Sequence, residues 1–397
     1  MESIREIYKI GHGPSSSHTM GPRFAAERFG RENPDAYSFR VELYGSLAAT
    51  GKGHLTDVAI SETLNPKKVE FVWLPEKYLP FHPNGMKFQS IDESGNVIKE
   101  WTVFSVGGGK IIDPNQLDDV KEVYEQSHLK DILPWIEKKG QTYWEYVRDR
   151  EESDIGDYLN EVWKAMQQSI MDGLDAEGVL PGELNLRRKA SSYWIKAQGY
   201  RPSLQSRALT MAYAMAVSEQ NASGGLVVTA PTCGSSGVLP AVLYHMKLNH
   251  NMTDKHILKA LATAGLFGNI IKNNASIAGA EVGCQGEVGS ACAMASAAVN
   301  QSFGGSPQQI EYAAEMGLEH HLGMTCDPVC GLVQIPCIER NAFAALRAFD
   351  ASLKAMLSDG KHIISFDRVV EVMKNTGHDL PSLYKETAEG GLAKIDL

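Results

Sequence analysis

The chain has 397 residues, of which 43% are hydrophobic and 22% charged, and its formal net charge is −10. This composition is that of a globular protein with two or more domains, and the negative charge argues against nucleic acid or an anionic membrane as the main partner. The N-terminal residues lack the apolar core of an export signal, and no apolar run is long enough to span a bilayer, so the sequence predicts a cytoplasmic protein.

The first third of the chain alternates apolar and polar residues with the period of β-strands. Strands are predicted over residues 38–45 and 67–74, and two more, over 86–91 and 97–106, flank a hairpin-type turn at Ser94-Gly95-Asn96. The stretch from Leu47 to Leu64 is predicted to be a loop that leads into a helix. The residues expected to share one face of each of the first two strands are Phe39, Val41 and Leu43, and Val69, Phe71 and Trp73.

From about residue 120 the apolar residues recur with the period of an α-helix. One helix is predicted to begin after Ser153 and Asp154, which are candidates for its N-terminal cap, and helices rich in alanine and methionine follow. Only LVVTAP, residues 226–231, has the character of a strand. The predicted fold class is therefore multidomain α+β. An N-terminal α+β domain with a mixed or antiparallel sheet covers residues 1–124, and a mostly all-α domain covers residues 125–397.

Three of the six cysteines, Cys284, Cys326 and Cys337, lie in the segments EVGCQGEVGS and CDPVCGLVQIPC. Without an export signal, they are better explained as reduced thiols or metal ligands than as disulfides. Thiolates are soft ligands that bind iron–sulfur clusters and zinc. Three thiolates at a site that takes four ligands leave one position open, as a Lewis-acid catalyst requires, and so indicate an enzyme. The alternative, that each cysteine is a small buried hydrophobe, stays open here.

Two further motifs concentrate hydroxyl groups between glycines and prolines. GHGPSSSHTMGP, residues 11–22, contains Ser15, Ser17, His18 and Thr19, which can hold a carboxylate or cap a helix that starts near Gly21. The two interpretations have equal weight from local sequence alone. TAPTCGSSG, residues 229–237, is predicted to be a strand-to-helix turn in which Thr232 either grips an anion or belongs to an ordinary tight turn.

His54 lies in the loop TGKGHLTD, where it is a candidate general base or a surface histidine without a role. His82 and Asn84 in FHPNGM have the same ambiguity. Around Cys284 the chain carries many polar side chains in an otherwise apolar helical region, which indicates a lined site. They are Asn273, Asn274, Ser276, Glu281, Gln285 and Glu287.

Together, GPSSSHT, TGKGH, TAPTCGSSG, EVGCQGEVGS and CDPVCGLVQIPC resemble the iron–sulfur bacterial L-serine dehydratases of the single-chain type, over residues 3 to about 360. The resemblance implies a small-molecule substrate, L-serine, that is converted to pyruvate and ammonia in amino-acid degradation and gluconeogenesis. It also implies a homodimer and a 4Fe–4S cluster with one iron free for substrate. The residues it implies are Cys284, Cys326 and Cys337 for the cluster, His54 as the base, and Ser15, Ser17, His18, Thr19, Thr232 and Asn274 for substrate binding.

The chain departs from the family pattern at Cys233, where asparagine is usual, at Cys330, which raises an alternative ligand, and in its tail, which ends without a cysteine. The role of Cys292 is not determined by the sequence. Three other functions are alternatives to the one that the resemblance implies. A pyridoxal-phosphate dehydratase would need a Schiff-base lysine and a phosphate cup, and no such motif is visible. An L-cysteine desulfidase on a related cluster scaffold and a non-enzymatic amino-acid sensor with a structural metal stay open.

Overall fold

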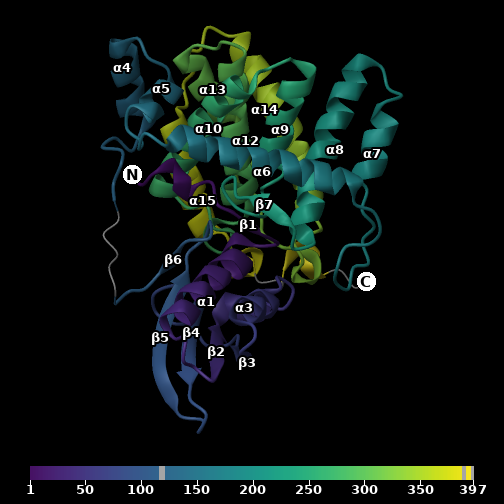
Figure 1. Ribbon diagram of the computed structural model, residues 1–397. Helices are drawn as coiled ribbons and strands as arrows, with labels where there is room; N and C mark the ends of the chain where they lie inside the picture. The colour runs from purple at the N-terminus through teal and green to yellow at the C-terminus, as the bar shows by residue number, and fades with distance from the viewer. Residues whose placement is uncertain (116–120, 387–389, 395–397) are drawn as a thin grey trace.

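The computed structural model describes residues 1–115, 121–386 and 390–394. Figure 1 shows a sheet with helices on it at one end of the molecule and a larger body of helices at the other. This arrangement confirms the predicted multidomain α+β class, with the sheet formed early in the chain and the helices after it.

The main sheet has five strands in the order β3-β2-β4-β5-β6. Strand β2 runs parallel to the edge strand β3 and antiparallel to β4, and the remaining pairs are antiparallel, so the sheet is mixed, as predicted. The described strands are β1 (Ile10–His12), β2 (Ser38–Tyr44), β3 (Lys68–Leu74), β4 (Gly85–Ile91), β5 (Val97–Ser105), β6 (Ile111–Ile112) and β7 (Leu226–Val228).

One face of this sheet is covered by helices α1 (Gly21–Glu32) and α3 (Thr56–Leu64). The predicted inward residues of β2 are all buried, and Phe39 lies 5.9 Å from the ring of Phe29 on α1. Phe29 also packs against Phe88 of β4. A fully buried side chain of this size contributes on the order of 1.5–3 kcal/mol, so these rings fix α1 against the sheet.

In the segment from Leu47 to Leu64, the turn at residues 51–55 leads into helix α3, as predicted, but a short helix that was not predicted, α2 (Gly45–Thr50), comes before it. A six-residue helix is not stable in isolation. Leu47 is fully buried in the same core as Phe39, and the hydroxyl group of Thr50 donates to the carbonyl oxygen of Ser46. Tertiary burial therefore forms this helix.

The helices of the larger body surround α12, which is buried along nearly its whole length. Its small residues let α10, α13 and α14 approach closely, so the predicted helices rich in alanine and methionine pack against one another in this body. The described helices after the sheet are α4 (Leu129–Lys139), α5 (Tyr143–Arg148), α6 (Ile155–Asp175), α7 (Ala190–Ala197), α8 (Pro202–Ala222), α9 (Val238–Asn249), α10 (Asp254–Asn274), α11 (Gly279–Val282), α12 (Ser290–Ser302), α13 (Pro307–Glu319), α14 (Cys337–Met356) and α15 (Phe366–Asp379).

The first residues of the chain join the helical body. Ile4, Ile7 and Tyr8 are fully buried in its core, and the hydroxyl group of Tyr8 donates to the carbonyl oxygen of Leu261. Strand β1 then pairs with β7, more than two hundred residues later, in a two-stranded antiparallel sheet. The expected division after residue 124 does not anticipate this crossing and stays a prediction.

Helix α6 begins at Ile155, with Asp154 in the N-cap position, as predicted, but the Asp154 side chain makes no capping hydrogen bond. Its carboxylate instead forms an ion pair with Arg5. The predicted position of the cap is therefore confirmed, and the predicted capping interaction of its side chain is wrong. No helix in the described ranges combines the length and the apolar composition needed to cross a membrane.

Two glycines of α6 provide a test of the packing between α6 and α8. A methyl group at Gly173 would lie 2.8 Å from the Ala216 Cα atom and closer still to its carbonyl group, whereas a methyl group at Gly156 would meet nothing within 4 Å. We expect Gly173→Ala to lower the free energy of unfolding by about 1–3 kcal/mol, because the helices must move apart. Gly156→Ala, the matched control, should change it by less than about 1 kcal/mol. Thermal unfolding followed by circular dichroism measures both, and equal midpoints would contradict this packing.

Candidate active site

A cavity lies where the loops of the sheet end meet the helical body. Its residues come from three parts of the chain: the N-terminal segment, the helical body and the C-terminal segment. They are Pro14, Ser15, His54, Gly234, Cys284, Glu287, Val288, Cys326, Pro328, Val333, Cys337 and Glu386. The predicted base, His54, and the three predicted ligand thiols therefore line one cavity.

The three predicted ligand thiols share this cavity. Cys284 precedes a turn of π-helix, Gln285–Gly289, Cys326 lies in a loop, and Cys337 begins α14. All three are free thiols. A hydrogen bond with Cys284 and burial raise the pKa of Cys326 well above its usual range, and burial and the neighbouring Cys284 do the same for Cys337. Cys326 and Cys337 therefore keep their protons unless a cation stabilises their thiolates.

Glycine makes the close approach of these thiols possible. A side chain at Gly279 would lie 3.1 Å from the Cys326 sulfur and 2.8 Å from a carboxylate oxygen of Glu287. Gly283, directly before Cys284, has a φ of 74°, which favours glycine, and a side chain there would meet the carbonyl oxygen of Met324. These positions explain why the segment around Cys284 is rich in glycine.

The donor set fits a thiolate-bound metal group. The sulfur atoms of Cys284 and Cys326 and a carboxylate oxygen of Glu287 all lie within 4.8 Å of one another, and Cys337 lines the same cavity. Soft sulfur ligands of this kind suit an iron–sulfur cluster or zinc.

The other cysteines do not line this cavity. Cys233 is buried in the strand-to-helix turn before α9, and Cys292 is buried in α12, where its sulfur lies 3.4 Å from the carbonyl oxygen of Ala344. Cys330 is exposed, with a φ of 55°, and lines a separate groove beside Lys52 and Gly53. Cys330 is therefore not placed with the three thiols as an alternative ligand.

His54 is almost completely buried, so it is not a surface histidine. Its Nδ1 atom lies 3.0 Å from the carbonyl oxygen of Thr50, which can only accept, so Nδ1 carries the proton. Its Nε2 atom is buried without a hydrogen-bond partner in the described part of the chain. Burial, and then the neighbouring ring of His18, lower the pKa of His54 to about 3. The side chain is therefore neutral at physiological pH, with the lone pair on Nε2.

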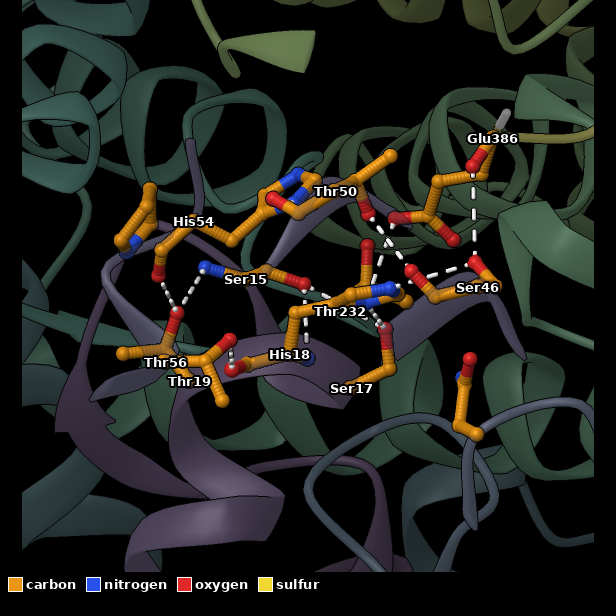
Figure 2. Close-up of polar contacts among 12 residues, drawn as sticks. Ser15, Ser17, His18, Thr19, Ser46, Thr50, His54, Thr56, Thr232 and Glu386 are labelled. Carbon is orange, nitrogen blue, oxygen red and sulfur yellow. Dashed lines mark hydrogen bonds and ion pairs between the residues drawn. The ribbon is translucent and has the colours of Figure 1, made fainter. Parts of the chain in front are cut away.

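The serine-rich motif caps a turn of π-helix, Ser16–Met20, which leads into α1, and its predicted role in holding a carboxylate stays a prediction. The Ser15 hydroxyl group accepts from the His18 N–H, as a cap does, and Ser15 also lines the cavity. Ser17 lies 2.8 Å from the Nδ1 atom of His18, and Ser46 lies 3.3 Å from its Nε2 atom. Figure 2 shows this chain of hydroxyl groups and imidazole, which Glu386 reaches from the C-terminal segment. Both nitrogens of His18 are thus engaged, and burial lowers its pKa to about 4.

Two of the predicted substrate-binding residues instead contact the protein. The Thr19 hydroxyl group donates to the carbonyl oxygen of His54 and accepts from the Ser15 N–H, so it joins the serine motif to the base. The Thr232 hydroxyl group donates to Glu287 Oε1 at 2.8 Å and therefore orients that carboxylate. Both residues are buried beside the cavity and position groups that line it.

Asn274 is not brought into this group. It lies at the end of α10, and its amide donates to the carbonyl oxygens of Ser127 and Ile270. Of the other polar residues near Cys284, only Glu287 lines the cavity, while Glu281 pairs with His82 at 3.5 Å. The described structure thus gives Asn274 a role in the backbone contacts of α10.

Sequence reasoning missed Ser46 and Glu386. Ser46 follows Gly45, whose φ of 51° turns the chain sharply at the end of β2. Glu386 lies shortly before a pair of glycines near the C-terminus. This position in the sequence is too weak a signal to identify a site residue. Burial raises the pKa of both Glu386 and Glu287 to about 7, and the charge of Glu386 adds to the shift of Glu287.

A neutral buried imidazole, hydroxyl groups and soft ligands around one cavity are the components of an enzyme active site. The comparisons with known proteins agree. The profile of the serine dehydratase beta chain matches residues 3–72, and that of the alpha chain matches residues 84–393. The L-serine dehydratase of Streptomyces coelicolor is 41% identical over 98% of both chains. The corresponding protein of Haemophilus influenzae is 37% identical, and L-serine dehydratase 1 of Escherichia coli is 36% identical, each over 99% of both chains. The chain therefore belongs to the serine dehydratase family, whose members are lyases.

The positioning role of Thr19 is open to test. Thr19→Val leaves the His54 carbonyl oxygen and the Ser15 N–H without their partner, so we expect the free energy of unfolding to fall by about 1–3 kcal/mol. Thr19→Ser keeps the hydroxyl group and should recover most of this loss. Urea denaturation measures both variants. Unchanged stability in Thr19→Val, with weakened substrate binding, would return Thr19 to the substrate-binding set.

Proposed function

We propose that this chain is an L-serine ammonia-lyase that eliminates water from L-serine and yields pyruvate and ammonia, with a 4Fe–4S cluster held by Cys284, Cys326 and Cys337. One observation carries the proposal: the three thiols and the unprotonated Nε2 atom of His54 come from distant segments and line the same cavity. The names of the relatives support the choice of substrate. A homodimeric state and a cytoplasmic location stay predictions of the sequence.

The reaction must remove a weakly acidic proton from Cα and expel a poor leaving group. When bound, the cluster supplies a Lewis-acidic iron that makes the serine hydroxyl group a better leaving group. His54 accepts the Cα proton at Nε2, and the hydrogen bond from Nδ1 to Thr50 holds the ring in the tautomer that this step requires. The hydroxyl groups of Ser15 and Ser17 hold the substrate carboxylate. The enamine product then tautomerises and hydrolyses in water.

The cluster can be tested through its ligands. Protein purified without oxygen should be brown and contain about four irons and four sulfides per chain. Cys284→Ser, Cys326→Ser and Cys337→Ser should each lose the colour and the iron, because each removes one thiolate. Cys233→Ala and Cys330→Ala are the controls and should keep both. Absorbance spectra and iron analysis decide the question, and a bleached Cys330→Ala beside a brown Cys337→Ser would overturn the ligand assignment.

The role of His54 has its own test. His54→Ala should keep the brown colour and bind serine, yet lose about two to four orders of magnitude in turnover, which is the usual contribution of a general base. It should also fail to exchange the Cα hydrogen of bound serine with deuterated solvent. The matched control is His378→Ala, since His378 is exposed on α15 and should be dispensable. Rapid turnover and normal exchange in His54→Ala would remove His54 from the mechanism.

A further inference from the structure

The carboxylate of Glu386 is the part of the cavity wall that comes from the C-terminal segment. Hydrogen bonds to the loop that carries Cys326 hold residues before and after Glu386 in this segment. The Cys326 N–H donates to the carbonyl oxygen of Tyr384, and the Glu386 N–H donates to the carbonyl oxygen of Cys326, each at 2.8 Å. The Leu392 N–H donates to the carboxylate of Asp327 at 2.9 Å. The position of Glu386 is therefore set by the same loop that carries one of the thiols.

The backbone of Glu386 is strained in this position. Its φ is 60°, in the left-handed region that residues other than glycine seldom adopt. Strained residues of this kind concentrate at functional sites. The backbone conformation places the carboxyl side chain in the wall of the cavity, where Glu386 is only 7% exposed.

The described residues give this buried carboxylate no cationic partner. His18 Nδ1 lies 3.7 Å away, but burial keeps that imidazole neutral and its two nitrogens already face Ser17 and Ser46. No lysine or arginine within the described ranges forms an ion pair with Glu386. His82, the other nearby imidazole, pairs with Glu281. A buried carboxylate without a cation is costly, and a second one, Glu287, lines the same cavity.

We propose that Glu386 binds the ammonium group of the amino-acid substrate. The inference rests on the proposed function and adds the residue that selects an amino acid over the corresponding acid without the amino group. An ammonium ion is the cation that such a substrate brings, and it removes the penalty of the buried charge. With the ammonium group at Glu386 and the carboxylate at the serine motif, the amino acid occupies the cavity that His54 also lines. The C-terminal segment is then part of the substrate site.

The test compares two ligands that cannot react because they lack the hydroxyl group, L-alanine and propanoate, which differ in the ammonium group alone. Isothermal titration calorimetry of the protein purified without oxygen gives both dissociation constants. In the unsubstituted protein L-alanine should bind more tightly than propanoate. In Glu386→Gln the advantage of L-alanine should fall by about 10- to 100-fold, the usual loss for a hydrogen bond to a charged group. The affinity for propanoate should hold or increase, because one negative charge is gone.

Glu281→Gln is the matched control, since its carboxylate is already paired with His82 and hydrogen-bonded to Ser276, and it should leave the ratio of the two constants unchanged. An unchanged ratio in Glu386→Gln overturns the inference. The inference is also overturned if the electron paramagnetic resonance spectrum of the reduced cluster, measured without ligand, differs between Glu386→Gln and the unsubstituted protein. Such a difference would make Glu386 a metal ligand. If the unsubstituted protein holds no cluster and does not deaminate serine, the proposed function fails instead. If the unsubstituted protein deaminates serine but the ratio of the two dissociation constants is unaltered in Glu386→Gln, only the role of Glu386 is refuted.

Discussion

The hydrogen bond between the Nδ1–H of His54 and the carbonyl oxygen of Thr50 determines what the site can do. It spans four residues at the end of α2, a helix that exists only because Leu47 is buried against the sheet. The bond fixes the proton on one nitrogen and leaves the lone pair on the other. Burial then keeps the ring neutral. A histidine in an exposed loop would titrate near neutrality and rotate freely, so the packing of α2 is what keeps this imidazole neutral and in one orientation.

The site contains buried groups whose lone pair or ionised form the described protein does not fully stabilise. The Nε2 atom of His54 has no hydrogen bond, and the Glu386 carboxylate has no cation. A hydrogen bond with Cys284 and burial raise the pKa of Cys326, and burial and the neighbouring Cys284 raise the pKa of Cys337, so both thiols keep their protons. Each of these groups would be stabilised by a different component of the reaction: a proton, an ammonium ion and a metal. The polar surroundings are therefore organised before the ligands arrive, which is the condition for efficient electrostatic catalysis.

The crossing of the N-terminal segment explains why these groups meet. Tyr8 and its neighbours anchor the start of the chain in the helical core, and β1 pairs with β7 immediately before the turn that contains Thr232. The next residues after β1 are those of the serine-rich motif. The same crossing thus brings Ser15 into the wall of the cavity and Thr232 beside it, and it connects the sheet to the helical body. The hydroxyl group of Thr19 extends the connection to His54.

The sequence by itself determined the β-strands, the helical body and the identity of the thiols, because strand and helix periods and soft-ligand chemistry are local properties. Only the tertiary structure decided what the hydroxyl and carboxylate groups do. A threonine can bind a ligand or a backbone carbonyl group with the same atoms, and Thr19 takes the second role because His54 lies beside it. Asn274 lies apart from the cavity, because its amide donates to the carbonyl oxygens of Ser127 and Ile270. Glu386 enters the cavity through backbone bonds to Cys326, sixty residues earlier in the chain. Contacts across such distances have no pattern in a single sequence, because they depend on how complete elements pack.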